Sequence, residues 1–402
     1  MLQCSMQTLF YLGIIFVLGA FVQWLSPKLF LPKVVSYLLL GLIIGPEVLN
    51  IIPHSFVNNA DVVIEMSLSL IAVMIGASLK FSHIKEVGKD VLYITFFQTI
   101  FAFISVSLGF YLFSGLLSLP SEYALVMSIL LGGLATATAP AATIAVIHEL
   151  KAKGKFSRIL LGVVALDDAM ALILFAFAIT LSKAIIDLGE FQFISFLHTF
   201  TIIFYSTIIG IAGALLSNLM ENLFKSHKGM ETISTIGLVF VVYSLNISLS
   251  LEPLFSALIM GVFMTNFSKH FDLVQDEIDN HLEEIIFMLF FILSAMHLKF
   301  DMIMDFPFVL IAYVLLRLIG KVIGASIGAR LANSDEYVKK YMGLALLPQA
   351  GLAIGLALSL QDEVVFASIT TFILNLIIAT TIIHELIGPL LTRYILKKSK
   401  EG

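Results

Sequence analysis

Long apolar runs, separated by short charged or Gly/Pro-containing segments, cover almost the whole chain. A run of about 20 apolar residues can cross the hydrocarbon core of a bilayer as a helix. The pattern predicts thirteen transmembrane helices, at 8–25, 34–52, 60–79, 91–113, 122–147, 158–182, 193–220, 232–247, 251–267, 284–298, 306–330, 340–361 and 364–392. The closely spaced runs at 232–247 and 251–267 are assigned to two helices because Asn246 and Glu252 interrupt them.

Composition agrees with this pattern. Of the 402 residues, 59% are hydrophobic and only 13% are charged, whereas a soluble domain has about 25% charged residues. The chain is therefore predicted to be an all-α polytopic membrane protein. The net charge of −5, without a basic block, does not suggest a nucleic-acid partner. A single cysteine, Cys4, excludes an internal disulfide framework and a cysteine-based metal site.

The positions of lysine and arginine predict the orientation. With the N-terminus outside and the C-terminus in the cytoplasm, nearly all basic residues of the connecting segments fall on the cytoplasmic side. The exceptions are Lys183 and Lys299, while Arg317 and Lys321 lie inside a helix. We therefore expect a multi-pass protein of the cell inner (cytoplasmic) membrane. Residues 1–402 are expected to form a single transmembrane unit, with no soluble regulatory domain.

The two halves of the chain resemble each other weakly. The third predicted helix ends I-G-A-S-L-K-F-S and the tenth ends L-S-A-M-H-L-K-F-D, while Pro140 and Pro348 interrupt the fifth and twelfth. Because the members of each pair are seven positions apart in the order of helices, an odd number, the repeats, at about 8–182 and 232–392, have opposite topology, with 193–220 as a linker helix. Inverted repeats with interrupted helices are typical of secondary transporters. One proline alone would indicate a simple kink.

Two adjacent carboxylates, Asp167 and Asp168, interrupt the apolar run from Ile159 to Leu181. An aspartate at the centre of a membrane helix costs ~2.5–3.5 kcal/mol and usually marks an ion path or a proton relay. Neighbours on a helix point about 100° apart, so the two side chains face different environments. Burial favours the protonated carboxyl and a nearby cation favours the ionised one, so such a site can hold either a proton or a metal cation.

The segment from Gly132 to Ala145 is rich in Gly, Ala and Thr. Small residues allow helices to cross closely, and Pro140 frees backbone carbonyls in the preceding turn. Hydroxyls of Thr136, Thr138 and Thr143 add oxygen ligands of the kind that an alkali cation needs. Close packing alone is the other interpretation of this segment. We therefore treat Thr138 as a candidate cation ligand.

Arg317 and Lys321 lie one helical turn apart, on one face of the eleventh predicted helix. Buried cations need anionic partners, and lysine, unlike arginine, can give up its proton. We predict that Lys321 pairs with Asp167; for Arg317, which lies nearer the outer end, a structural tether is the alternative role. His384 and Glu385 are expected near the cytoplasmic interface, where they would solvate a helix end. The acidic segment 272–284 is expected to be a solvated connector.

Taken in order, these segments resemble the monovalent cation:proton antiporters, in the branch of the Kef-type and related sodium/proton exchangers. The resemblance covers almost the whole chain. It is carried by the following segments: L-P-K-V-V-S-Y-L-L-L-G-L-I-I-G-P, A-T-A-T-A-P-A-A-T, V-A-L-D-D-A, F-I-L-S-A-M-H-L-K-F-D and L-I-G-K-V-I-G-A-S-I-G-A-R-L.

The resemblance implies a homodimer in which a mobile core domain moves like an elevator against a dimerisation domain. The interrupted helices with Pro140 and Pro348 would cross, and Thr136 and Gln349 would lie at the crossing. Asp168 would carry the cation (Na⁺) or the proton, and Asp167 would form a breakable salt bridge to Lys321. In this family, paired aspartates are associated with electrogenic exchange, in which more protons than cations move in each cycle. No cofactor is implied.

Two departures from the family bear on function. The segment L-L-P-Q-A-G-L-A around Pro348 lacks the Arg-Gly-Glu type pattern of many relatives. Ligand-gated potassium efflux is disfavoured, because the chain has neither the cytosolic nucleotide-binding domain nor the Gln-Asp pair of the Kef-type systems.

The sequence therefore predicts a secondary antiporter, not an enzyme, that exchanges protons for Na⁺, or for Li⁺ or K⁺. The alternatives are a sodium-coupled organic-anion symporter of similar fold, a K⁺/H⁺ exchanger and a channel. An intramembrane aspartyl protease would need aspartates on two helices and a Gly-x-Gly-Asp motif, which is missing.

Overall fold

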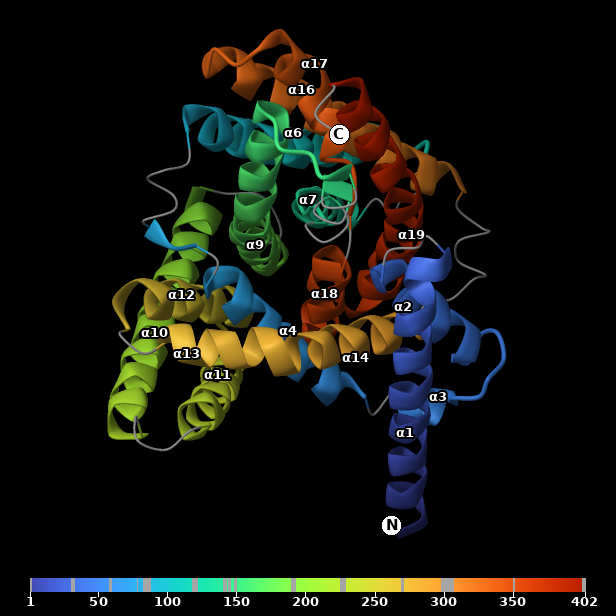
Figure 1. The fold of residues 1–402 in the computed structure, drawn as a ribbon, viewed down its shortest axis with the longest axis vertical. Coiled ribbons are helices and arrows are strands. Elements are labelled where there is room, and N and C mark those ends of the chain that lie inside the picture. Colours follow the sequence, from blue (N-terminus) through green and yellow to red (C-terminus); the bar gives the residue numbers. More distant parts are fainter. Residues whose placement is uncertain are drawn as a thin grey trace.

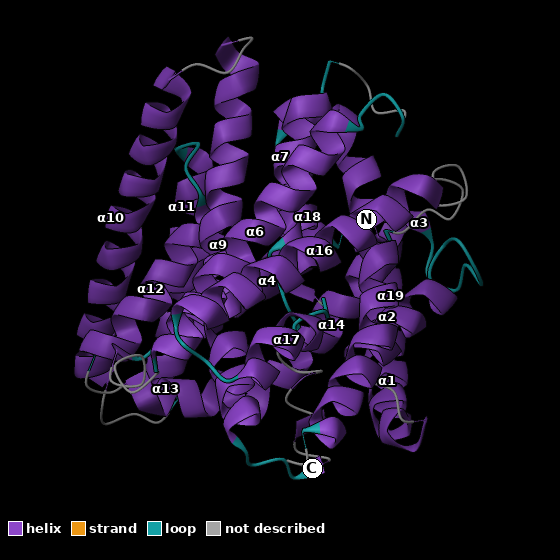
Figure 2. Ribbon diagram, turned by 90° about the horizontal axis from the view of Figure 1, so that it is seen from above, coloured by secondary structure: helices purple, strands orange, loops and turns teal. Residues whose placement is uncertain are grey.

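The computed structural model describes residues 2–399, apart from 30–32, 58–59, 78, 82–87, 118–121, 140–142, 144–145, 148–149, 189–192, 225–228, 269–270, 298–306 and 350. All regular structure in this described part is helical (Figures 1 and 2). The main helices are α1 (Leu2–Leu25), α2 (Lys33–Ile44), α3 (His54–Val57), α4 (Asp61–Ala77), α6 (Lys89–Leu112), α7 (Ala124–Ala135), α9 (Lys155–Leu188), α10 (Phe193–Phe224), α11 (Met230–Ser248), α12 (Pro253–Phe267), α13 (Phe271–Glu277), α14 (Glu283–Ala295), α16 (Pro307–Leu331), α17 (Glu336–Ala345), α18 (Gly351–Ser359) and α19 (Ala367–Lys398).

Every predicted transmembrane segment overlaps at least one of these helices. Within the described residues, seven helices are long and apolar enough to cross a membrane, namely α1, α6, α9, α10, α11, α16 and α19. The separation of α11 from α12 is confirmed, since α11 ends at Ser248 and Glu252 lies in the connection before α12. The chain is therefore a multi-pass membrane protein.

The prediction of a solvated connector at 272–284 is wrong. This segment is helical, because α13 continues through a π-helical turn (Ile278–Leu282) into α14. Phe271, Val274 and Ile278 are buried at helical spacing, whereas Asp272 and Asp276 are exposed. The stripe of apolar residues on one face stabilises an amphipathic helix despite the acidic residues on the other.

The helices form two groups. We call α1, α2, α4, α10, α11, α12 and α14 the flanking group, and α6, α7, α9, α16, α17, α18 and α19 the crossing group. Within the flanking group, α4 packs against α12 and α14, and α14 packs against α2. Within the crossing group, α6 packs against α16, α7 and α9. Figure 1 shows the short helices α7 and α18 between α9 and α19.

Glycines bring α6 and α16 into backbone contact. A Cβ atom at Gly324 would lie 2.4 Å from the carbonyl oxygen of Phe97, and Gly320 and Gly328 press on α6 in the same way. The contacts move backwards along α6 as they move forwards along α16, so the two helices are antiparallel. Small residues permit this approach, and it places Gln98 of α6 beside Lys321 of α16.

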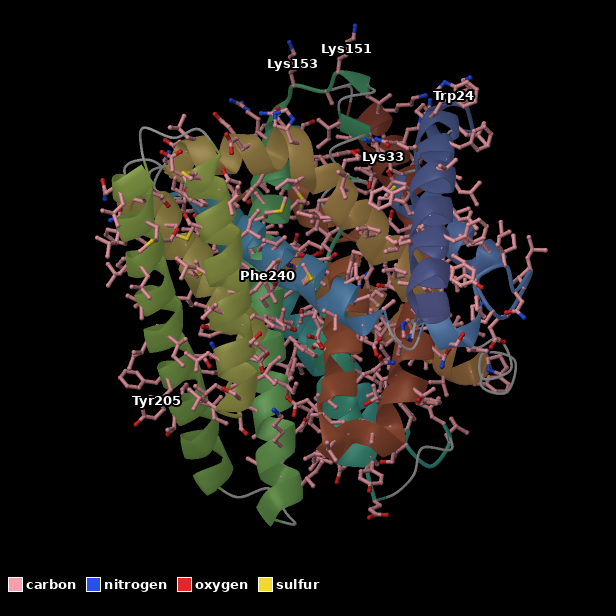
Figure 3. All side chains as sticks on the ribbon, turned by 90° about the horizontal axis from the view of Figure 1, so that it is seen from below. Trp24, Lys33, Lys151, Lys153, Tyr205 and Phe240 are labelled. Carbon is pink, nitrogen blue, oxygen red and sulfur yellow. The ribbon has the colours of Figure 1, made fainter. Side chains whose placement is uncertain are left out.

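The outer surface matches a membrane protein. Large apolar side chains face outwards on several helices, for example Leu112 (72% exposed) and Phe308 (76% exposed). Figure 3 shows Lys33, Lys151 and Lys153 at one end of the molecule, near Trp24 at the end of α1. The ammonium group of Lys28 lies 3.1 Å from the centre of the Trp24 ring, an arrangement that suits a membrane–water interface.

Candidate functional site

Two helix breaks meet in the middle of the crossing group. The first helix, α7, ends at Ala135, and residues 137–139 are not helical; the second, α17, ends at Ala345, and residues 347–349 are not helical. The residue before a proline avoids the helical conformation, which explains why Pro348 ends α17. The backbone N–H of Ala139 donates a hydrogen bond to the carbonyl of Pro348 over 2.9 Å. Pro140 itself lies outside the described residues.

Arg317 ties the two breaks together. Its side chain is fully buried and donates hydrogen bonds to backbone carbonyls from both interrupted helices. The acceptors are the carbonyls of Ala135 (3.0 Å), Ala137 (2.6 Å), Leu347 (2.6 Å) and Pro348 (3.5 Å). Each break leaves carbonyls without helical partners, and the guanidinium supplies donors in a fixed planar arrangement. The structural role predicted for Arg317 therefore agrees with its contacts.

Gln349 adds a second link at the crossing. Its amide nitrogen donates hydrogen bonds to the carbonyl of Leu134 (3.0 Å) and to the hydroxyl of Tyr313 (3.1 Å). Pro348 and Gln349 thus both contact the end of the other interrupted helix.

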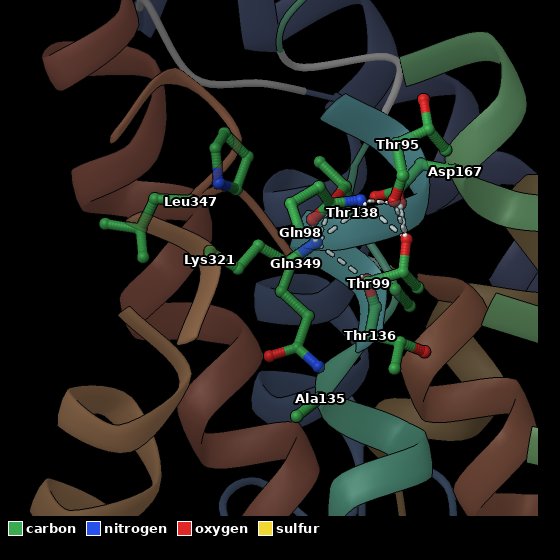
Figure 4. A network of polar contacts seen from close by, with 12 residues as sticks. Thr95, Gln98, Thr99, Ala135, Thr136, Thr138, Asp167, Lys321, Leu347 and Gln349 are labelled. Atoms are coloured by element: carbon green, nitrogen blue, oxygen red, sulfur yellow. Dashed lines mark hydrogen bonds and ion pairs between the residues drawn. The ribbon is translucent and has the colours of Figure 1, made fainter. Parts of the chain in front are cut away.

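A buried ion pair lies beside this crossing (Figure 4). The Nζ atom of Lys321 is 3.2 Å from Oδ2 of Asp167, and both side chains are fully buried. The three ammonium protons also face oxygens of Thr136, Thr138 and Gln98. These distances are 2.7 Å to the Thr136 carbonyl, 2.6 Å to Thr138 Oγ1 and 2.8 Å to Gln98 Oε1. Lys321 is therefore fully solvated by protein oxygens.

Two α6 residues that the sequence analysis did not select complete the network. Gln98 donates from its amide to Asp167 Oδ1 and accepts from Lys321, so it bridges the two charges. The hydroxyl of Thr99 lies 3.3 Å from the same carboxylate oxygen. The feature of the sequence that could have identified them is the polar pair Gln98-Thr99 inside the apolar run at 91–113.

Asp168 differs from its neighbour. Asp167 is fully buried within the network, whereas Asp168 is partly exposed. Its Oδ1 atom is buried and has no hydrogen-bond partner in the described part of the chain. Adjacent helical positions point in different directions. The carboxylate of Asp167 is therefore paired with Lys321, whereas that of Asp168 lies at the edge of the network, where its buried Oδ1 atom has no partner among the described residues.

The expectation for His384 and Glu385 is wrong. Both side chains are 1% exposed and lie inside the crossing group instead of solvating a helix end. α19 continues to Lys398, more than three turns beyond Glu385. The apolar pattern alone could not reveal this, because the burial comes from α16 and the α17–α18 break packing against α19.

The structure thus brings together Asp167, Lys321, Thr136 and Thr138, with Asp168 next to them and Pro348 and Gln349 at the adjoining crossing. Two interrupted helices that meet beside buried carboxylates are typical of secondary transporters.

Comparison with known proteins agrees with this class. The family described as "Sodium/hydrogen exchanger, transmembrane" matches residues 13–398. The chain is 25% identical over 339 residues to the probable Na⁺/H⁺ antiporter GerT of Bacillus cereus, covering 83% of this chain and 85% of that protein. It is 22% identical over 369 residues to the Na⁺/H⁺-K⁺ antiporter GerN of the same organism, covering 89% of each chain.

A solved structure shows the same fold. The sodium proton antiporter MjNhaP1 from Methanocaldococcus jannaschii at pH 8 superimposes with a TM-score of 0.75 and 20% sequence identity, over 98% of this chain and 99% of that one. This fold is the inverted repeat with a core and a dimerisation domain, as the sequence predicted.

Fold and family together define a membrane transporter that exchanges cations for protons, and not an enzyme. The chain belongs to the sodium/hydrogen exchanger family.

Proposed function

We propose that this protein exchanges Na⁺ for H⁺ at Asp168, which binds one or the other but not both. The observation that carries the proposal is the difference between the two acids. Lys321 and Gln98 already neutralise and hydrogen-bond Asp167, whereas Asp168 has a buried oxygen without a partner. A carboxylate of this kind accepts a proton or a desolvated cation, and competition between the two couples their fluxes.

The neighbouring residues have supporting roles in this proposal. Lys321 holds Asp167 in place through the ion pair, so that the charge beside Asp168 is already compensated. Thr138 is bound to Lys321 over 2.6 Å, and its hydroxyl becomes available to a cation only if this contact loosens. The salt bridge between Asp167 and Lys321 would then break and re-form during transport.

Alternating access is assigned to the two helix groups. In the proposal, the crossing group is the mobile core domain and moves like an elevator against the flanking group, which forms the dimer. The N-terminus lies outside and the C-terminus in the cytoplasm of the inner membrane, and Lys33, Lys151 and Lys153 at one end of the molecule support this orientation (Figure 3).

K⁺ is the second candidate cation. It is favoured by the similarity to GerN, whose name includes potassium. Na⁺ and K⁺ are distinguished by the number and flexibility of coordinating oxygens rather than by residue type, so the transport assay must include both, together with Li⁺.

The test uses the purified full chain in proteoliposomes with a fluorescent reporter of internal pH. Addition of Na⁺ is expected to move protons across wild-type vesicles, and Asp168→Asn is expected to abolish this movement, because an amide neither ionises nor releases a proton. Asp335→Asn is the matched control, since Asp335 is 62% exposed and pairs with Lys155 at the surface. Cation-driven proton movement in the Asp168→Asn vesicles at the wild-type rate would overturn the proposal.

A further inference from the structure

A second pair of titratable side chains is buried in the crossing group, away from Asp168. His384 and Glu385 of α19 are each 1% exposed, and both ring nitrogens and both carboxyl oxygens lack hydrogen-bond partners in the described part of the chain. The ring of His384 lies near the carbonyl of Thr380, without the geometry of a hydrogen bond. Buried polar atoms without partners are rare in folded proteins and require an explanation.

These side chains lie against the crossing. A Cβ atom at Gly388, one turn after His384, would lie 2.5 Å from Pro348 Cγ, so this face of α19 presses on the α17–α18 break. The ring of His384 packs edge-on against Tyr313, with centres 6.5 Å apart. Tyr313 is in turn hydrogen-bonded to Gln349. The pair is thus connected to the helix crossing through two contacts.

Among the residues that the structure describes, Arg317 forms no ion pair with an acid. Lys321 is neutralised by Asp167, but the hydrogen bonds that Arg317 donates within these residues go to backbone carbonyls. Glu385 lies within electrostatic reach of Arg317. A buried carboxyl group is stable either when it is protonated or when a nearby cation compensates its charge. Glu385 can therefore be buried as the neutral acid or as the carboxylate with Arg317 nearby.

We propose that Glu385, with His384 beside it, is a second proton-binding site of the protein, separate from Asp168 and coupled to it through Arg317. The ligand is a proton, and the acceptor is the carboxylate of Glu385. When Glu385 is ionised, its negative charge offsets part of the field of Arg317 at the crossing. When it is protonated, the full charge of Arg317 acts on Asp167, the neighbour of Asp168.

The groups that face the pair come mainly from α16, which contributes Tyr313, Arg317 and Lys321. Two other packed helices, α7 and α18, contain no titratable side chain in their sequences. Tyr337 and Tyr341 of α17 contact the far end of α19, at Ile395 and Lys398. On α2, Lys33 and Tyr37 are bound to Glu284.

Infrared difference spectroscopy between acid and alkaline pH tests the site directly on the purified full chain without added cation. Wild-type protein is expected to show carbonyl bands of protonated carboxylic acids for both Glu385 and Asp168. Glu385→Gln should delete one band and keep the other, Asp168→Asn should do the reverse, and Glu336→Gln, at an exposed position, should delete neither. A Glu385→Gln spectrum identical to wild type would overturn the proposal. If this variant does not fold, Glu385→Asp must shift the same band, and an unshifted band overturns it equally.

The effect that Glu385 is expected to have on transport rests on the proposed exchange at Asp168, whereas the spectroscopic detection of its protonation does not. At pH values at which Glu385 is ionised, removing its negative charge makes it easier for Asp168 to lose its proton. Glu385→Gln vesicles should therefore exchange cations but show the acid limb of their activity shifted to lower pH. An unchanged pH profile together with a deleted band would overturn the coupling through Arg317. Loss of exchange in Asp168→Asn, with the Glu385 band intact, keeps the two proposals distinguishable.

Discussion

The backbone N–H of Ala139 donates a hydrogen bond to the carbonyl of Pro348, so the breaks of two helices more than 200 residues apart join directly over 2.9 Å. Arg317 binds carbonyls on both sides of this junction. Non-helical backbone at membrane depth is tolerated only where protein or a water-filled cavity surrounds it. Here the protein supplies the donors, and the acids Asp167 and Asp168 lie beside them.

Replacing Lys321 by alanine should destabilise the fold strongly. The variant leaves Asp167 buried without its cation, and removing one partner of a buried ion pair costs about 3–5 kcal/mol. The thermal unfolding midpoint in detergent should fall clearly, with exchange lost or reduced. Lys339→Ala is the control, because Lys339 pairs with the 90% exposed Glu336 at the surface, and such a pair contributes about 0–1 kcal/mol. Equal midpoints for the two variants would contradict the buried ion pair as a stabilising contact.

Gln98→Ala tests the bridge that the sequence analysis missed. Gln98 donates to Asp167 and accepts from Lys321, so its truncation leaves two buried charged groups each short of one hydrogen bond. The expected loss of stability is about 1–3 kcal/mol, measured as a lower unfolding midpoint. Gln361→Ala, at an exposed position, should leave the midpoint within experimental error. A Gln98→Ala variant as stable as wild type would exclude a bridging role.

Gly324→Ala tests the contact between α6 and α16. The new methyl group would lie 2.4 Å from the Phe97 carbonyl oxygen and 2.6 Å from Gln98 Cα, so the helices must separate and displace Gln98 from Lys321. We expect a fall in the unfolding midpoint equivalent to about 1–3 kcal/mol and slower exchange. Gly237→Ala, in α11 with open space around it, should be neutral or stabilising by up to about 1 kcal/mol. The opposite order of stability would refute the close packing.

Glu252 predicts a pH dependence of stability. This residue, in the connection before α12, is buried beside Lys183 and Glu363, and burial raises its pKa from 4.5 to about 8, with Lys183 opposing the rise. Between these two pH values the unfolded chain releases the proton and the folded chain keeps it, so stability falls as pH rises through this window and levels off above it.

The measurement is the unfolding midpoint in detergent as a function of pH. Glu252→Gln should flatten the decline between pH 4.5 and about 8, and the exposed-site variant Glu122→Gln should follow the wild-type curve. Parallel curves for wild type and Glu252→Gln would show that the carboxyl of Glu252 titrates normally.

Much of the architecture follows from local pattern. The apolar runs give the positions of the helices, because a helix in lipid must be apolar over its whole length. The two prolines mark the breaks, since proline removes a backbone donor and clashes with the preceding turn. The charge asymmetry and the Asp-Asp pair were also visible in the sequence, because ionisable residues are conspicuous in an apolar run.

Pairwise geometry was only partly accessible. Lys321 could be selected as a partner for Asp167 because few charges lie inside the predicted helices. Gln98 could not be selected in this way, because a single glutamine in an apolar helix is compatible with many positions. Its role depends on which face of α6 the glycines of α16 contact.

The sequence by itself determined which segments are helices, where two of them break and which residues carry charge. Tertiary structure alone decided that Gln98 bridges the ion pair, that Asp168 has a buried oxygen without a partner among the described residues, and that His384 and Glu385 are buried. The physical reason is that hydropathy is a property of single residues along the chain, whereas burial and hydrogen bonding depend on which distant helices come into contact.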